Sequence, residues 1–310
     1  MITPRIAVIC GGVSAEREVS LVSGRSVTDV LETVYPGHVD FFEINSAALP
    51  DGLDPAVHVV FPVLHGTFGE DGGIQTLLEE RGFTYAGCDI AASQLCMNKQ
   101  HTKDHVAAVG VRLAPGICVT AGSLPSPDNI IAQLGHSLVI KPSDQGSSVG
   151  LSLVESRDEL VQALNAITAG EWLIEKRIVG RETTVGILHG KALGIVEVVP
   201  VSGVYDYKHK YTKGMTEYRY PAQMSPEAES EIKNFAERAF AVCRCRDYAR
   251  IDFILAPNGA YFLEINTIPG LTATSLLPKS ASCSGYDFAA LARAMLAPAF
   301  GRFANLVPSS

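Results

Sequence analysis

Two neighbouring segments near the C-terminal end of the sequence carry polar side chains in a pattern that can hold a metal ion. Residues 248–255 and 260–266 read as strands, and the Pro-Asn-Gly sequence between them predicts a tight turn. Since successive side chains of a strand point to opposite faces, Arg250 shares a face with Asp252 and Glu264 shares a face with Asn266, so the hairpin can gather all four polar residues on one side. Carboxylate and amide oxygens suit Mg²⁺, which takes its remaining ligands from water and substrate phosphates. The same alternation is also typical of a half-buried antiparallel sheet whose polar face meets solvent.

A loop rich in glycine and serine in the middle of the chain is a candidate phosphate site. Lys141 ends a predicted strand over 137–141, and the sequence Pro-Ser-Asp-Gln-Gly-Ser-Ser-Val-Gly follows it. Small residues let backbone N–H groups approach a phosphate closely, and the lysine could neutralise phosphate charge. The loop is not a Walker A motif, in which the lysine directly precedes Ser or Thr and a helix follows. Taken alone, the loop is equally well interpreted as a plain hairpin connection.

Two ionisable side chains follow predicted strands in the N-terminal third. Glu16 lies after strand 5–10, within Gly-Gly-Val-Ser-Ala-Glu-Arg-Glu-Val-Ser (11–20), and His65 follows strand 58–64. Ligands of open parallel sheets bind at the carboxyl ends of strands. Glu16 could hold an amine or stabilise a helix N-terminus, and His65 could carry protons or be purely structural. The glycine spacing is not GxGxxG, which argues against a dinucleotide-binding fold.

Residues 205–211, Tyr-Asp-Tyr-Lys-His-Lys-Tyr, are too polar for a core strand. They could form a plain exposed loop. Long polar loops in compact domains are often lids, and lids exclude water from reactive intermediates.

The order of the predicted elements indicates an α/β protein in three parts. Over 1–97, strands 5–10 and 58–64 with helices 20–34 and 73–81 predict a parallel sheet covered on both faces. Over 98–181, a small α+β unit is predicted from strands 137–141, 151–154 and 172–175 and helices 103–109 and 157–167. Over 182–310, strands 183–188 and 192–199, helix 226–243 and the hairpin predict a larger α+β unit.

Composition narrows the class of protein. The 310 residues include 25 Lys and Arg against 33 Asp and Glu, and the formal net charge of −8 argues against nucleic-acid binding, which depends on basic contacts to phosphates. The 7 cysteines contain no CxxC pair, so we expect reduced thiols and a cytoplasmic protein. The first residues lack signal-peptide features, and the apolar runs fall far short of the ~18 residues of a membrane span. We therefore expect neither a nucleic acid nor a membrane as partner.

Taken in chain order, these segments resemble the D-alanine–D-alanine ligase family of the ATP-grasp superfamily. The resemblance runs from Gly11 to about Leu296 and rests on motifs that are each moderately specific but highly specific together. Besides residues 11–20, 141–150 and 205–211, they are His-Gly-Thr-Phe-Gly-Glu-Asp-Gly (65–72) and Glu-Ile-Asn-Thr-Ile-Pro-Gly-Leu-Thr (264–272). The resemblance implies an ATP-grasp fold with an N-terminal parallel-sheet domain, a small central α+β domain and a larger C-terminal α+β domain.

The same resemblance implies an enzyme that joins two D-alanines for peptidoglycan synthesis. In this family the first D-Ala carboxylate attacks the γ-phosphate of ATP, which gives an acyl phosphate and ADP. The amine of the second D-Ala then attacks the carbonyl carbon, and phosphate leaves. The implied cofactors are ATP and Mg²⁺ or Mn²⁺, with two ions, and the implied assembly is a homodimer.

Residue roles follow from the motif matches. The implied contacts of the first D-Ala are Glu16 and His65, and Glu16 is linked to Ser147 and Tyr211 by hydrogen bonds. The implied contacts of the second D-Ala are Ser275 and Leu276. The implied ATP contacts are Lys99, Lys141 and Lys210 for the phosphates, Glu175 and Glu182 for adenine and ribose, and Ser147 of the loop. Asp252, Glu264 and Asn266 match the metal ligands, and Arg250 and the N–H of Gly270 match the oxyanion stabilisers.

Asn98 stands where the family usually has Asp, but the adjoining Lys99 is kept.

Three rival functions stay open. A D-alanine–D-lactate or D-alanine–D-serine ligase is the nearest rival, although depsipeptide-forming relatives usually lack the lid tyrosine that is present here as Tyr211. The others are an ATP-grasp ligase of different amino acids and a nucleotide-binding regulator without catalysis. Retention of the metal and oxyanion residues argues against the regulator.

Overall fold

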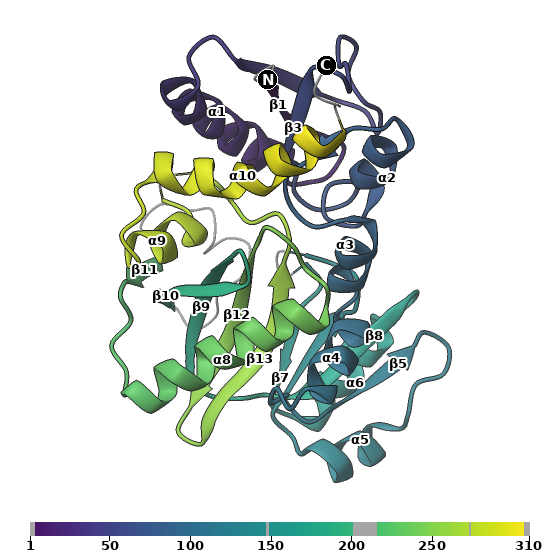
Figure 1. The fold of residues 1–310 in the computed structure, drawn as a ribbon. Coiled ribbons are helices and arrows are strands. Elements are labelled where there is room, and N and C mark those ends of the chain that lie inside the picture. Colours follow the sequence, from purple (N-terminus) through teal and green to yellow (C-terminus); the bar gives the residue numbers. More distant parts are fainter. Residues whose placement is uncertain (1–3, 147–148, 201–215, 273, 307–310) are drawn as a thin grey trace.

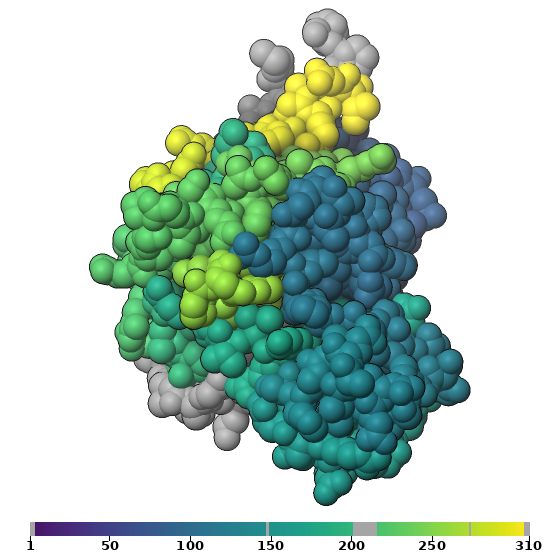
Figure 2. All heavy atoms as spheres, turned by 90° about the horizontal axis from the view of Figure 1, so that it is seen from below, coloured from purple at the N-terminus to yellow at the C-terminus, as the bar shows by residue number. Residues whose placement is uncertain are grey.

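Three β-sheets organise the computed structural model, which describes residues 4–146, 149–200, 216–272 and 274–306 (Figure 1). One sheet is parallel and lies in the N-terminal part, and two are antiparallel and lie in the central and C-terminal parts. Seen from below, the central residues form a lobe beside the green C-terminal residues (Figure 2). No helix of the described residues is both long enough and apolar enough to cross a membrane.

The N-terminal sheet has the order β2-β1-β3-β4 and is parallel, as predicted. Its strands are β1 (Arg5–Gly11), β2 (Val39–Ile44), β3 (His58–Val63) and β4 (Thr84–Tyr85). β1 and β3 are almost continuous runs of buried residues, because helices cover both faces of the sheet. β2 is absent from the sequence prediction, since this outer strand is only partly buried.

Helices from both ends of the chain cover the N-terminal sheet. α1 (Arg17–Val34) and α10 (Phe288–Leu306) share one core with Val8 and Phe61, and α2 (Gly73–Glu80) packs on the other face. Figure 1 shows the yellow α10 running beneath α1. The last helix of the chain therefore lies against the N-terminal sheet, although its residues follow the C-terminal one in sequence.

An ion pair fastens α10 to both neighbouring sheets. Arg302 Nη1 and Nη2 donate to Asp247 Oδ1 and Oδ2 at 2.8 and 2.6 Å, and Nη2 also donates to the Tyr85 carbonyl at 2.8 Å. The backbone N–H of Gly87 donates to Asp247 Oδ2 at 2.9 Å. The Asp247 side chain is only 2% exposed, so these contacts satisfy a buried carboxylate.

The central sheet has the order β5-β8-β6-β7. Its strands are β5 (Gly116–Thr120), β6 (Leu138–Pro142), β7 (Ser152–Val154) and β8 (Glu171–Lys176). α5 (Pro127–Leu134) and α6 (Arg157–Asn165) bury their apolar residues against it, and Ser126 and Ser156 cap their N-termini. The two helices cover one face and leave the other face to the neighbouring sheet.

The C-terminal sheet has the order β11-β10-β9-β12-β13. Its strands are β9 (Arg181–Leu188), β10 (Lys191–Pro200), β11 (Thr216–Arg219), β12 (Tyr248–Ala256) and β13 (Gly259–Asn266). α8 (Pro226–Val242) packs against Ile251, Phe253 and Ile265, and the short α9 (Leu276–Ser282) packs on β9 and β10. The predicted hairpin is therefore confirmed.

Two helices connect the N-terminal and central parts: α3 (Ile90–Met97) and α4 (Lys99–Ala108). α4 begins at Lys99, four residues earlier than predicted, because the side chain of Asn98 caps it by accepting from His101 N at 2.9 Å. All 7 cysteines are free thiols, as expected.

Candidate active site

A cavity of about 470 Å³ lies between the central and C-terminal sheets. Apolar side chains from both sheets line part of it, among them Val139, Leu153 and Ile254. Six residues singled out in the sequence also line it: Lys99, Lys141, Glu175, Glu182, Asp252 and Glu264. The cavity thus combines apolar walls, which suit a flat aromatic ring, with cations and carboxylates.

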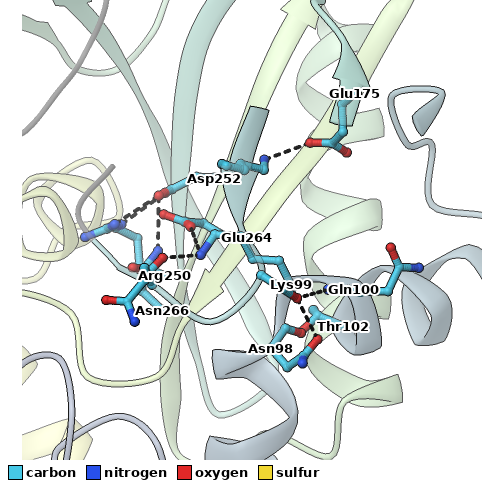
Figure 3. A network of polar contacts seen from close by, with 12 residues as sticks. Asn98, Lys99, Gln100, Thr102, Glu175, Arg250, Asp252, Glu264 and Asn266 are labelled. Atoms are coloured by element: carbon cyan, nitrogen blue, oxygen red, sulfur yellow. Dashed lines mark hydrogen bonds and ion pairs between the residues drawn. The ribbon is translucent and has the colours of Figure 1, made fainter. Parts of the chain in front are cut away.

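The four polar residues of the hairpin do lie together. Arg250 pairs with Asn266 and Asp252 with Glu264 in the register of β12 and β13. Arg250 Nε and Nη2 donate to Asp252 Oδ1 and Oδ2 at 3.0 and 2.9 Å, and Asn266 Nδ2 donates to Asp252 Oδ2 at 3.1 Å (Figure 3). Asp252 is 7% exposed. This face of the sheet therefore lines an enclosed site and is not an open polar surface.

A β-bulge makes this arrangement possible. From the turn up to Phe253 and Phe262 the hairpin pairs regularly, and the register then shifts by one residue so that Asp252 faces Glu264. Without the shift Asp252 would face Leu263, and Glu264 would share the core face with Phe262. The bulge at Leu263 therefore turns Glu264 and Asn266 toward the cavity.

Lys99 joins the hairpin to the helical connection. As the first residue of α4 it places Nζ 3.6 Å from Glu264 Oε2. Asn98, at the position where the resemblance implies an Asp, caps α4 and accepts from Ser143 Oγ at 3.1 Å. Because an amide oxygen accepts hydrogen bonds as a carboxylate does, Asn98 caps the helix turn that begins with Lys99 as an Asp would.

Glu175 lies between two lysines at the cavity wall. Lys141 Nζ is 2.8 Å from Glu175 Oε2, and Lys103 Nζ contacts Glu175 Oε1. Burial by itself would raise the pKa of Glu175, but the charges of Lys141 and Lys103 lower it to about 2. Lys103 did not emerge from the sequence analysis. The sequence feature that could have revealed Lys103 is its spacing of four residues from Lys99. In a helix that starts at Lys99, this spacing places both lysines on one face.

Glu16 and His65 lie side by side at the carboxyl ends of β1 and β3. Ser14 Oγ donates to the His65 carbonyl at 2.6 Å and accepts from Glu16 N at 3.1 Å. A Cβ built at Gly66 would lie 3.0 Å from Glu16 Oε2, and one at Gly146 would lie 3.7 Å from the same atom. The glycine-rich loop after Lys141 therefore approaches Glu16.

His65 links this edge to the segment that follows β13. Its Nδ1 lies 3.0 Å from the Ile268 carbonyl, which fixes the proton on Nδ1, and its Nε2 lies 3.4 Å from Ser23 Oγ. Burial lowers the pKa of His65, so the ring is neutral near pH 7. A neutral ring at this place can orient a ligand without adding charge.

The carboxyl of Glu70 was not singled out in the sequence. Part of the residue reaches the surface, but the carboxyl turns inward and Oε2 accepts from Gly66 N at 2.7 Å. Burial and the neighbouring charge of Glu16 raise the pKa of Glu70 to about 8. The site thus holds a protonated carboxylic acid beside Glu16 at neutral pH.

The raised pKa of Glu70 predicts a stability change with pH. Because the folded protein binds this proton more tightly than the unfolded chain, the stabilisation is fully present below about pH 4.5 and is lost as pH rises through about 8. In Glu70→Gln, which keeps an acceptor oxygen for Gly66, we expect Tm to fall less steeply across that window than in the unmodified protein. Thermal unfolding at a series of pH values checks this, and parallel curves would contradict it.

The segment after β13 brings together Gly270 and Ser275. A Cβ built at Gly270 would lie 3.0 Å from Ser275 Oγ, and Ser275 Oγ accepts from Thr272 N at 3.0 Å. Leu276 is 8% exposed and packs with Val196 and Val198 on β10. Three other predicted site residues lie outside the described residues: Ser147, Lys210 and Tyr211.

The fold and the site define a class of protein. Two antiparallel α+β units enclose a cavity with lysines on the central side and paired carboxylates on the C-terminal side. Solved D-alanine–D-alanine ligases, which have the ATP-grasp fold, superpose on nearly the whole chain, and this architecture is therefore the ATP-grasp fold.

Sequence and structure comparisons identify the family. The family profiles described as D-ala D-ala ligase N-terminus and C-terminus match residues 37–88 and 106–297. The D-alanine–D-alanine ligase of Syntrophotalea carbinolica is 39% identical over 303 residues, which are 95% of this chain and 96% of that protein. The chain belongs to the D-alanine–D-alanine ligase family.

Two solved structures extend the comparison. The D-alanine–D-alanine ligase from Bacillus anthracis complexed with ATP is 28% identical, with a TM-score of 0.81 over 98% of this chain and 100% of that one. The VanG D-Ala:D-Ser ligase from Enterococcus faecalis is also 28% identical, with a TM-score of 0.82 over 96% of this chain and 99% of that one. The fold is therefore shared by ligases that differ in their second substrate.

Proposed function

We propose that this protein catalyses the ATP-dependent, ADP-forming ligation of two D-alanines to D-alanyl-D-alanine for peptidoglycan precursor synthesis. The observation that carries the proposal is a single cavity lined by Lys99 and Lys141 from one side and by the paired carboxylates Asp252 and Glu264 from the other. This is the charge pattern needed to bring a triphosphate and a carboxylate together. Membership of the family supplies the substrate class.

The nucleotide would lie in the cavity between the sheets. The apolar walls can accept the adenine ring, with Glu175 and Glu182 for the polar atoms of adenine and ribose. Lys99 and Lys141 would bind phosphates, and we propose the same for Lys210 and Ser147 from the family match. These cations offset the repulsion between the triphosphate and the attacking carboxylate, which is the main electrostatic obstacle to the first step.

Asp252, Glu264 and Asn266 fit one or two Mg²⁺ or Mn²⁺ ions. They present oxygen donors on one face of a rigid hairpin, with two of them directly opposite each other. Two carboxylates and one amide leave coordination positions for phosphate oxygens, which is how Mg²⁺ is commonly held. Bound there, the metal would neutralise charge on the transferring phosphoryl group.

Arg250 and Gly270 would stabilise the developing oxyanion, and Asp252 orients the guanidinium through its two hydrogen bonds. Glu16 would hold the ammonium group of the first D-Ala, with Ser147 and Tyr211 completing the hydrogen-bond chain. Neutral His65 would orient the carboxylate of the same substrate.

We place the second substrate against Ser275 and Leu276. The hydroxyl of Ser275 lies next to the backbone of Gly270, where a side chain would intrude. A carboxylate bound to that hydroxyl would bring its amine near the acyl phosphate. We further propose domains over 1–97, 98–181 and 182–310, a homodimer and a cytoplasmic location, with D-alanine and ATP as small-molecule partners.

The first experiment measures ADP release by the purified protein with Mg²⁺-ATP. The arms contain no amino acid, D-Ala, D-Ala with D-Ser, D-Ala with D-lactate, or L-Ala, and mass spectrometry identifies the products. We expect ADP release that depends on D-Ala, D-alanyl-D-alanine as the main product, and loss of turnover on chelation of the metal. A mixed product in preference to D-alanyl-D-alanine would favour the D-serine or D-lactate alternative, and ATP binding without any D-Ala-dependent turnover would contradict the proposal.

A further inference from the structure

Glu175 forms ion pairs with two lysines, one of which is also a proposed phosphate ligand. Its side chain is 7% exposed, and each carboxylate oxygen meets one lysine: Oε2 meets Lys141 and Oε1 meets Lys103. A buried carboxylate of this kind is costly unless it keeps an ionic partner. Yet Lys141 is also a proposed phosphate ligand, and one ammonium group serves a carboxylate and a phosphate poorly at the same time.

The two lysines differ in their position relative to the cavity. Lys141, from β6, lines the cavity together with Glu175 from β8. Lys103, from α4, is not among the described residues that line it, and its side chain is only 5% exposed. Lys103 therefore approaches Glu175 from behind the cavity wall, where it is out of reach of a nucleotide.

The electrostatics around Lys103 agree with a fixed counter-ion. Burial and the charge of Lys141 lower the pKa of Lys103 to about 8, and the charge of Glu175 opposes this shift. At neutral pH the ammonium form of Lys103 is thus retained, and its charge is balanced by Glu175. If Lys141 turns toward phosphate, its repulsion of Lys103 weakens, and the pair formed by Lys103 and Glu175 becomes tighter.

We propose that Lys103 is a positioning residue that keeps Glu175 ionised and aimed into the cavity, and thereby releases Lys141 to bind the phosphates of ATP. This inference rests on the proposed function, because it assumes that the cavity takes ATP. Lys103 touches neither substrate nor nucleotide and acts only through Glu175. Its removal should weaken ATP binding without slowing the chemical steps.

The test compares Lys103→Met with the exposed control Lys233→Met, which removes the surface ion pair to Glu229 on α8. In Lys103→Met, Lys141 is left as the partner of a buried carboxylate and is held there. We expect KM for ATP, and the Kd for ATP from calorimetry, to rise about tenfold or more, the size expected for one charge-assisted hydrogen bond. kcat at saturating ATP, KM for D-Ala and all constants of Lys233→Met should stay within about twofold.

A second variant separates positioning from a general packing role. Glu175→Gln removes the charge that retains Lys141, so adding Lys103→Met to Glu175→Gln should raise the Kd for ATP by less than about twofold. An equal loss in both backgrounds, or an unchanged Kd in Lys103→Met, would overturn the inference. Should Lys103→Met not fold, Lys103→Gln, which keeps a donor to Glu175 without the charge, replaces it with the same expected outcome.

Calorimetry with ATP keeps the two proposals distinguishable. If the unmodified protein binds ATP but shows no D-Ala-dependent turnover, the proposed ligase activity fails while the role of Lys103 is still measured. If the ligase is active and Lys103→Met binds ATP normally, the inference alone fails.

Discussion

Replacing Arg250 with alanine is expected to lower kcat on the order of a hundredfold or more while the protein remains folded. Removal of one preorganised donor to a developing oxyanion typically costs about 3–4 kcal/mol of transition-state stabilisation. Here the effect should be at the upper end, because Asp252 holds the guanidinium by two hydrogen bonds and so limits its motion. Steady-state kinetics with saturating D-Ala and ATP give the measurement.

Two further variants make the result interpretable. Arg250→Lys keeps the positive charge but loses the fork that binds both oxygens of Asp252, so its kcat should recover only part of the loss. Arg157→Ala removes an exposed ion pair to Asp128 on the central lobe and should leave kcat unchanged. Near-normal turnover of folded Arg250→Ala would remove Arg250 from the mechanism.

The second large effect concerns stability. In Arg302→Ala the buried Asp247 carboxylate loses both charged hydrogen bonds and keeps the backbone N–H of Gly87. Breaking a buried ion pair costs about 3–5 kcal/mol, and we expect about 3 kcal/mol because the Arg302 side chain is 32% exposed. Thermal or urea unfolding should show a clearly lower transition for this variant.

The matching control removes the Asp247 charge together with its partner Arg302. Since the cost arises from an unpaired carboxylate, Asp247→Asn combined with Arg302→Ala should be more stable than Arg302→Ala alone. If the double variant is instead less stable, the arginine contributes mainly through packing of α10. Either single change leaves the residues around the cavity in place.

The sequence predicted the elements with strong local signals. β1 and β3 are almost continuous apolar runs, α8 follows the helix cap Ser225, and the hairpin is marked by its Pro-Asn-Gly turn. β2 escaped prediction, as did the return of α10 to the N-terminal sheet. An outer strand lacks a continuous apolar run, and local periodicity does not reveal which sheet a distant helix will cover.

Contacts in the site could be predicted between residues that are close in sequence, but not between residues that are far apart in sequence and meet only in the folded chain. Strand alternation places Arg250 with Asp252 and Glu264 with Asn266, but the bulge that brings the two pairs to one face was not predicted. The contact of Lys103 with Glu175 joins residues 72 positions apart, and it depends on where the fold places α4 relative to β8. The hydrogen bond from His65 to the Ile268 carbonyl spans 203 positions, and no local pattern encodes it.

The bulge at Leu263 shifts the strand register by one residue and so divides the hairpin into two halves. The half next to the turn follows one pairing frame and supplies Phe253 and Phe262 to the core, while the half beyond it follows another and supplies Asp252 and Glu264 to the cavity. A one-residue change in the turn that shifts the strand pairing would therefore preserve the carboxylate face only if the bulge changes with it. Over evolutionary time the turn and the bulge should vary together in length, so relatives with a longer or shorter turn are where compensating changes near Leu263 are to be sought.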